Sequence, residues 1–195
     1  MRTITIISLL VLLSFSYEAE SPLVPFIRNF LLRLNQHLSE PIKASEKENR
    51  KKVLIKVTFK EITENDVIYS LEENNLIHLE IPNIKANAEG SFITSTRKKD
   101  PVIFSIKGEV ITSINMKLAI DTEFPIEGDS QRKIQVRITD LTTSTNLNSD
   151  YDKYNNVEYS EMYKKLKKKV EEQIYALISE KQLKKLTNKS FENIY

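Results

Sequence analysis

The residue types that most often carry out enzymatic chemistry are scarce in this chain. Cysteine is absent, and His37 and His78 are the only histidines. His37 falls near the end of a predicted helix and His78 on the polar side of a predicted strand, which are positions typical of surface residues. No Ser-His-Asp set, phosphate-binding loop or metal-ligand spacing stands out. We therefore expect a protein that is not an enzyme, needs no cofactor and holds no metal.

Basic side chains are the second group that could do chemistry, because they can bind anionic headgroups. The densest cluster is the run 164–169, where Lys164, Lys165 and Lys168 are expected on the exposed side of a helix. Near an anionic membrane each such cation contributes about 1 kcal/mol. Two glutamates follow closely, so a solvated helix face is the alternative interpretation. Arg97, Lys98 and Lys99 form a second basic patch at a predicted turn, where charge also serves solubility alone.

The N-terminal residues 1–16 have the pattern of a secretory signal peptide. Arg2 precedes an apolar run from Ile4 to Phe15, and small residues stand at positions suited to cleavage. An uncleaved membrane anchor is the alternative, but a dozen apolar residues fall short of the ~20 that span a bilayer. We therefore expect a secreted, extracellular protein.

Composition indicates one folded, soluble domain at residues 17–195. The chain has 195 residues, of which 40% are hydrophobic and 29% charged. The chain has 29 basic and 27 acidic residues, and 28 basic residues remain when Arg2 is removed with the signal peptide. The two charges nearly cancel, so the net charge gives no bulk attraction to nucleic acid. Stability must come from packing, since no disulfide can form. Asn188 lies in an Asn-Lys-Ser sequon, which makes it a candidate glycosylation site.

Hydrophobic periodicity predicts a helix, a run of strands and a second helix. Apolar residues recur at helical spacing from Phe26 to Leu38, and this helix should end before Pro41. The charged segment from Lys43 to Lys52 is interpreted as a linker. Alternation then predicts strands, and they cover 53–62, 67–71, 76–96, 102–121 and 134–147.

The longest alternating segment runs from Val102 to Asp121. In one extended strand it would span roughly 60 Å, far more than a usual strand of about 5–6 residues. The alternation changes phase at Pro82 in the preceding strand and after Ile138 in the following one, which predicts bulges, with Pro82 in an edge strand. Beyond Asn156 the period becomes helical from Tyr159 to Leu186, a helix of roughly 40 Å that could cover such a sheet.

The segment from Ile81 to Ile120, IPNIKANAEGSFITSTRKKDPVIFSIKGEVITSINMKLAI, resembles the N-terminal domain of bactericidal/permeability-increasing protein and related single-domain lipid-binding proteins. There an Asn-x-x-Ile-x-x-x-Gly strand also turns through basic residues into a long alternating strand. The chain thus looks like a member of the tubular lipid-binding superfamily. This resemblance implies an α+β fold, in which a long, highly curved antiparallel sheet wraps around a long C-terminal helix beside an N-terminal amphipathic helix. Those relatives usually carry a disulfide, and this chain cannot.

The resemblance also implies a cleft between sheet and helices that holds acyl chains of a phospholipid or fatty acid. Residues of the predicted apolar faces would line it. They are Leu31, Leu34, Phe104, Ile106, Val110, Ile114, Met116, Leu118, Ile134, Val136, Ile138, Leu166, Val170 and Ile174. From pattern alone, a closed core without a ligand is the other interpretation.

The resulting hypothesis is a secreted, non-catalytic lipid carrier. A rival hypothesis is an innate-defence protein that binds microbial glycolipid or a membrane surface through the two basic patches, as the resemblance implies for Arg97, Lys98 and Lys99. A third is a surface-active protein that opens at an air–water interface.

Overall fold

The structure is a computed structural model that describes residues 23–72, 76–94, 102–123, 133–150 and 157–191. The elements are α2 (Leu23–Leu38), β1 (Ile42–Glu48), β2 (Lys51–Phe59), the 3-10 helix η1 (Glu64–Asp66), β3 (Ile68–Glu72), β4 (Leu76–Thr94), β5 (Val102–Glu123), β6 (Lys133–Ser149), α3 (Val157–Leu177) and α4 (Glu180–Phe191). The predicted signal peptide at 1–16 and the basic turn Arg97, Lys98 and Lys99 lie outside the described residues.

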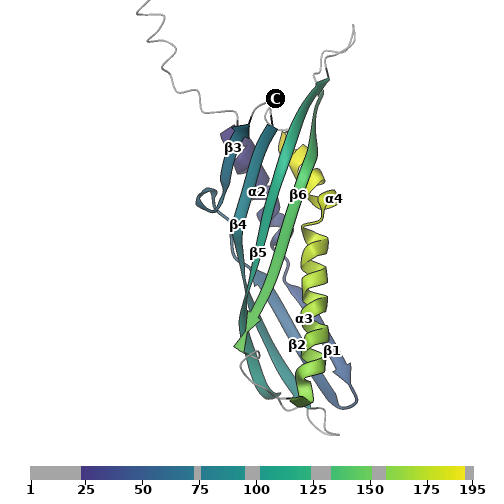
Figure 1. The fold of residues 1–195 in the computed structure, drawn as a ribbon. Helices are drawn as coiled ribbons and strands as arrows, with labels where there is room; N and C mark the ends of the chain where they lie inside the picture. The colour runs from purple at the N-terminus through teal and green to yellow at the C-terminus, as the bar shows by residue number, and fades with distance from the viewer. Residues whose placement is uncertain (1–22, 73–75, 95–101, 124–132, 151–156, 192–195) are drawn as a thin grey trace, which may run out of the picture.

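One long antiparallel sheet dominates the molecule, in the order β1-β2-β4-β5-β6, with β3 paired to the first part of β4. The strand β5 has 22 residues, which at ~3.3 Å per residue correspond to roughly 70 Å. Figure 1 shows the sheet as an elongated, strongly twisted layer with the helices along one side. The predicted α+β class and its curved sheet are confirmed.

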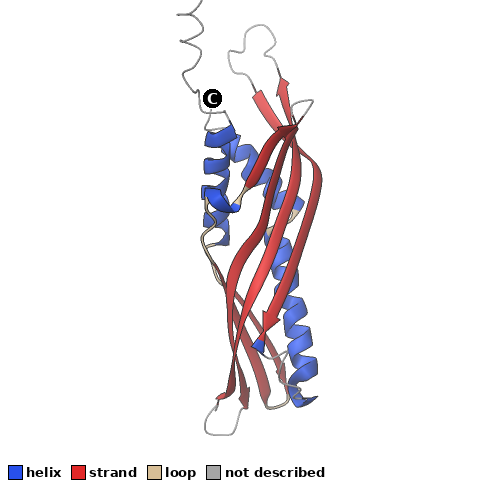
Figure 2. Ribbon diagram, turned by 60° about the vertical axis from the view of Figure 1, so that its left-hand side comes forward, coloured by secondary structure: helices blue, strands red, loops and turns tan. Residues whose placement is uncertain are grey.

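The helix α3 joins the two lateral edges of the curled sheet. It packs against β1 at one edge and β6 at the other, as well as against β2. Figure 2 shows the same relation from a second side, with the strands bending around the helices. A sheet whose two edges meet one helix encloses a tube, and the apolar side chains fill its inside.

Both predicted bulges are present. The pairing of β4 with β5 shifts register between Ile81 and Ile84, at Pro82. The pairing of β5 with β6 shifts opposite Lys117 and Leu118, where Thr139 is the extra residue. The placement of Pro82 in an edge strand was wrong, because β4 is central. A proline is tolerated there because β3 pairs with β4 only up to Glu80, and β2 pairs only from Ala86 onward.

The charged segment from Lys43 to Lys52 is not a linker. It contains β1, a two-residue turn and the start of β2, with Glu48 opposite Lys51. Asn49 in the turn has φ 52°, a left-handed conformation that asparagine tolerates. Alternation was hard to see because only Ile42 and Ala44 face the core in β1. The other positions of this edge strand are polar or charged.

The predicted C-terminal helix is interrupted at Ile178 and Ser179 and continues as α4 to Phe191. The Ser179 carbonyl accepts a hydrogen bond from the Leu183 backbone N–H at 2.9 Å, which starts the new helix. The buried residues Ile178 and Leu183 are five positions apart, one more than a continuous helical stripe allows. Because of the interruption, the apolar face of α4 points toward α2 and does not continue the apolar stripe of α3.

The helices α2 and α4 pack together at one end of the tube. The rings of Phe26 and Phe191 stack with centroids 4.2 Å apart. His37 Nε2 donates to the Leu177 carbonyl at 3.0 Å and so caps the end of α3. No helix in the described ranges is long and apolar enough to cross a membrane.

The connection from β2 to β3 is tied to α2 through side-chain amide and carboxylate groups. Asn35 bonds both the N–H and the carbonyl of Ile62, at 2.9 and 2.8 Å. Arg28 forms an ion pair with Glu64 at 2.8 Å. Asp66 accepts hydrogen bonds from the backbone N–H and hydroxyl of Thr63, and these bonds hold the pKa of that carboxyl below its usual value.

Candidate apolar ligand site

The inner face of β5 supplies the longest apolar row in the tube. Ile106 is 2% exposed, and Val110, Ile114, Met116 and Leu118 are fully buried. With Gly108 and Thr112 between them, these residues fill every second position from 106 to 118, so one side of the strand points to the interior over this length. The predicted register of this strand is therefore confirmed.

The opposite wall of the tube is helical. Leu166, Val170 and Ile174 are fully buried on α3, and their spacing of four residues keeps them in one stripe. On α2, Leu31 and Leu34 are buried as predicted, 4% and 0% exposed. The two helices thus contribute to the same core as β5, and the predicted site residues whose side chains are described are brought together.

Two of the three predicted residues of β6 lie at the same core. Val136 is buried and Ile138 is half-buried against the core. Phe104 and Ile134 lie in strand positions opposite Phe92 and Thr122. The side chains of Phe104 and Ile134 are outside the described ones.

The candidate site contains more residues than the sequence predicted. Buried side chains of β2 and β4 and additional helical residues belong to the same apolar cluster. They include Val53, Ile55, Val57, Ile77, Leu79, Ile81, Ile84, Ala86, Ala88, Phe92, Met162 and Tyr163. Alternation in the sequence marked the strand members as inward-facing, but only the pairing of β2 and β4 with β5 shows that they share one interior.

The interior is almost free of polar atoms. The Thr112 hydroxyl, fully buried among the inward residues of β5, is 3.3 Å from the hydroxyl of Thr145. The Ser149 and Tyr163 hydroxyls form a hydrogen bond between β6 and α3. In the described part of the chain, no buried side-chain nitrogen or oxygen lacks a hydrogen-bond partner. A molecule held here would therefore be recognised by apolar contact and not by charge.

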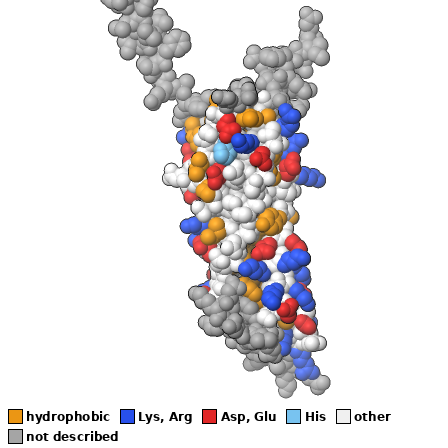
Figure 3. Space-filling view, in the orientation of Figure 1, with side chains coloured by type: hydrophobic (Ala, Val, Ile, Leu, Met, Phe, Trp, Pro, Cys, Tyr) orange, Lys and Arg blue, Asp and Glu red, His pale blue; other side chains and the backbone are white. Residues whose placement is uncertain are grey.

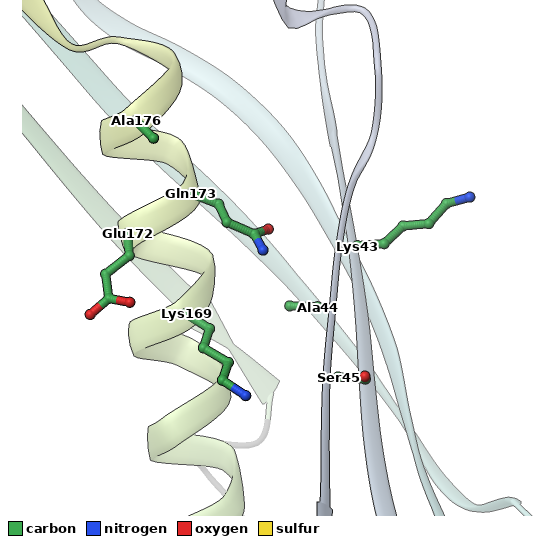
Figure 4. A pocket seen from close by; sticks show the side chains of 7 residues that line it. All are labelled: Lys43, Ala44, Ser45, Lys169, Glu172, Gln173 and Ala176. Carbon is green, nitrogen blue, oxygen red and sulfur yellow. The ribbon is translucent and has the colours of Figure 1, made fainter.

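Two open grooves follow the outside of the seam between β1 and α3. The first, about 450 Å³, is lined by Lys43, Ala44, Ser45, Lys169, Glu172, Gln173 and Ala176, which Figure 4 shows on the two facing elements. The second, about 550 Å³, shares Gln173 and Ala176 with it and continues toward His37, Pro41 and Ile42. The grooves run along the line at which the sheet edge meets the helix.

Small side chains line the seam, and an ion pair bridges it. Ala44 on β1 and Ala176 on α3 leave the space that forms the first groove. Lys169 on α3 and Glu46 on β1 form an ion pair across it. Unlike the junctions between strands, this junction has no ladder of backbone hydrogen bonds, because a helix cannot supply one.

The predicted headgroup residues of α3 are exposed on the outside of the tube. Lys164 pairs with Glu161 at 3.1 Å, and Lys168 lies 3.8 Å from Glu172. Lys165 is also exposed. Figure 3 shows basic side chains mixed with acidic ones on this face, in agreement with a partly neutralised helix surface.

The remaining residues singled out from the sequence lie outside the apolar interior. Asn188 is half-buried on α4, and its Oδ1 accepts a hydrogen bond from the Val136 backbone N–H at 3.1 Å. His78 lies on the outer face of β4, where its Nε2 is 3.0 Å from the Oδ1 of Asn115. Lys117 and Glu72 complete this outer cluster with an ion pair of 2.9 Å.

Comparisons with known proteins add no relative: no family model matches the chain, and no curated protein matches it. What can be said of function therefore rests on the fold and on its residues.

Proposed function

We propose that this protein is a secreted, non-catalytic lipid carrier of the tubular lipid-binding superfamily, and that it holds a phospholipid or fatty acid between its curled sheet and its helices. The supporting observation is the continuous apolar interior that extends along β5 and is closed by helices. A compact domain does not need an apolar row of that length. An acyl chain is a long, unbranched apolar molecule that matches it in shape.

Binding would draw on burial of methylene groups. Each methylene transferred from water into the interior contributes about 0.8 kcal/mol, so a long chain can bind without a polar anchor. Space for it must come from side-chain rearrangement or from movement of α3, because the inward residues of β5 and α3 are fully packed in the structure. Neither seam between α3 and a sheet edge, β1 or β6, is held by backbone hydrogen bonds, and the seam with β1 is the one along which the open grooves lie.

Native mass spectrometry of the protein secreted from a eukaryotic host tests the proposal. We expect a mass above that of the polypeptide, with a lipid recovered on solvent extraction. Purified protein should also take up fluorescent fatty acid or phospholipid. A ligand-free mass together with no uptake of either probe would overturn the proposal.

A pair of matched variants separates the interior from the surface. Ala88 is 2% exposed on the inner face of β4, and Ala119 is half-buried on the outer face of β5. Ala88→Leu should reduce uptake of the probe because it fills interior space, whereas Ala119→Leu should leave uptake unchanged. Circular dichroism on both variants shows whether each is folded.

A further inference from the structure

The outer face of the β1–β2 hairpin carries two pairs of lysines in direct opposition. Lys43 lies opposite Lys56, and Lys47 lies opposite Lys52. The residues that alternate with these lysines include the buried Ile42, Ala44, Val53, Ile55 and Val57, so the four lysine side chains point away from the core. Three of them are exposed and Lys52 is half-buried. We call these four residues the lysine face.

The spacing concentrates positive charge in a small area. Residues directly opposite on antiparallel strands have Cβ atoms about 4.5–5.5 Å apart, and like charges in such pairs destabilise a sheet. The two pairs are four residues apart along the strand, roughly 13 Å at ~3.3 Å per residue. Four ammonium groups therefore lie within about one to two Debye lengths of one another at physiological salt.

Acidic side chains of the described residues offset only part of the charge of this face, through Glu89 opposite Lys56. None of the four lysines has a carboxylate within ion-pair distance there. Glu46 alternates to the inner side and pairs with Lys169. Glu48 lies opposite Lys51 at the turn, and Glu89 lies opposite Lys56 on β4 without forming an ion pair.

Protection of a sheet edge does not account for the arrangement. Lysines on an edge strand prevent pairing with other chains, and Lys43 and Lys47 on β1 would suffice for that. Lys52 and Lys56 are on β2, which is paired on both sides. Glutamates at those two positions would have stabilised the hairpin through opposite-charge pairs. The repeated opposition of lysines favours an anionic partner outside the chain.

One apolar residue lies at the centre of the lysine face. Leu54 lies between the two lysine pairs, opposite Ser45, and its half-buried side chain points outward. An apolar residue surrounded by cations matches the surface of an anionic bilayer, where headgroup phosphates lie above acyl chains. Figure 4 shows that Lys43 extends away from α3, so it is free to contact a surface beside the seam.

We propose that the lysine face is a docking surface for an anionic phospholipid bilayer. This site is separate from the apolar interior, and it does not depend on whether the interior holds a lipid. Because β1 also borders the seam with α3, a docked bilayer would lie beside that seam.

Vesicle flotation tests the proposal on the full mature chain. Wild-type protein should bind vesicles of phosphatidylcholine containing about one third phosphatidylserine, and should not bind pure phosphatidylcholine. Since each lysine near such a surface strengthens binding about fivefold, K43Q/K47Q/K52Q/K56Q should weaken it about a hundredfold or more. Binding should also fall as salt rises.

The helix α4 offers a matched control, because it carries four exposed lysines, Lys181, Lys184, Lys185 and Lys189. K181Q/K184Q/K185Q/K189Q removes the same charge and should change vesicle affinity by less than about threefold. Equal losses in the two variants would show bulk attraction and overturn the proposal. So would wild-type protein that ignores anionic vesicles, or that binds heparin but not vesicles.

A stability measurement separates loss of the docking surface from loss of the fold. Removing opposed like charges should leave the hairpin variant at least as stable to heat as wild type at low salt. Loss of vesicle binding by a variant with an unchanged or higher Tm is then assigned to the lysine face. Uptake of a fluorescent fatty acid, measured on the same variant, should be retained, which distinguishes docking from carriage.

Discussion

Gly90 and Gly108 occupy places in the curled sheet where a side chain does not fit. A Cβ at Gly90 would lie 2.4 Å from the Leu54 carbonyl oxygen, and one at Gly108 would lie 2.4 Å from that of Asn148. Both obstacles are backbone atoms of the neighbouring strand, so no side-chain movement relieves the contact. The neighbouring strands therefore approach too closely at these two positions for a residue with a side chain.

We predict that Gly108→Ala destabilises the protein by about 1–3 kcal/mol, because β6 must shift to admit one methyl group. Chemical denaturation measures this free energy of unfolding. Ser105→Ala, at an exposed position of the same strand, should change it by less than about 0.5 kcal/mol. Equal stability of the Gly108 variant and wild type would contradict the proposed close approach.

For single residues, the sequence predicted the direction in which a side chain points more reliably than the residues that it contacts. Alternation along β5 placed Val110, Ile114 and Leu118 inside, and they are fully buried. It could not show that Asn188 bonds the Val136 backbone or that lysines of β1 and β2 oppose one another. Those relations depend on which residue of a distant segment lies opposite.

At the scale of elements, the stability of α4 depends on its contact with α2. Its twelve residues are too few for an isolated helix to be stable, so packing must hold it. Phe191, 7% exposed, stacks on the fully buried Phe26. The interruption at Ser179 is what points Phe191 toward α2.

We expect Phe191→Ala to cost about 3–5 kcal/mol, the usual range for truncating a buried phenylalanine. A double-mutant cycle with Phe26→Ala should give a coupling energy of about 0.5–1.5 kcal/mol, because both single variants remove the same stacked pair. Urea denaturation of the four proteins supplies the values. Additive effects of the two substitutions would show that the rings stabilise the protein independently.

The interpretation of residues 43–52 as a linker was wrong because of the kind of element that they form. An edge strand such as β1 buries few residues, so its composition is that of a loop. Conversely, the helical period from Tyr159 onward was strong enough to predict α3, while the interruption before α4 is marked only by one extra residue between buried positions.

For the whole molecule, the tube is closed without backbone pairing where α3 meets the two edge strands, β1 and β6, and the seam with β1 is the grooved one. Ala44 and Ala176 leave open grooves along it, and Lys169 and Glu46 form an ion pair across it. If a lipid enters by this route, the ion pair is one of the contacts that must open.

We predict that Glu46→Gln speeds exchange of a bound fluorescent fatty acid, by up to about fivefold, because partly exposed ion pairs contribute about 1 kcal/mol or less. Stopped-flow transfer to acceptor vesicles measures the rate. Glu161→Gln is the matched control, since it removes an ion pair within α3 only. Equal rates in wild type and both variants would argue against entry through the seam.

Apart from β1 and the division of the last helix, the sequence by itself determined the types of element, their order and the inward face of most of them, because these follow from periodicity that short stretches of chain express locally. It also indicated that β4 and β6 bend, since a change of phase in the alternation requires a bulge. Only the tertiary structure decided that the sheet curls until both edges meet α3, that the last helix divides to cover two regions, and that four lysines share one outer face. These features depend on register between segments far apart in the chain, and packing against distant partners selects that register.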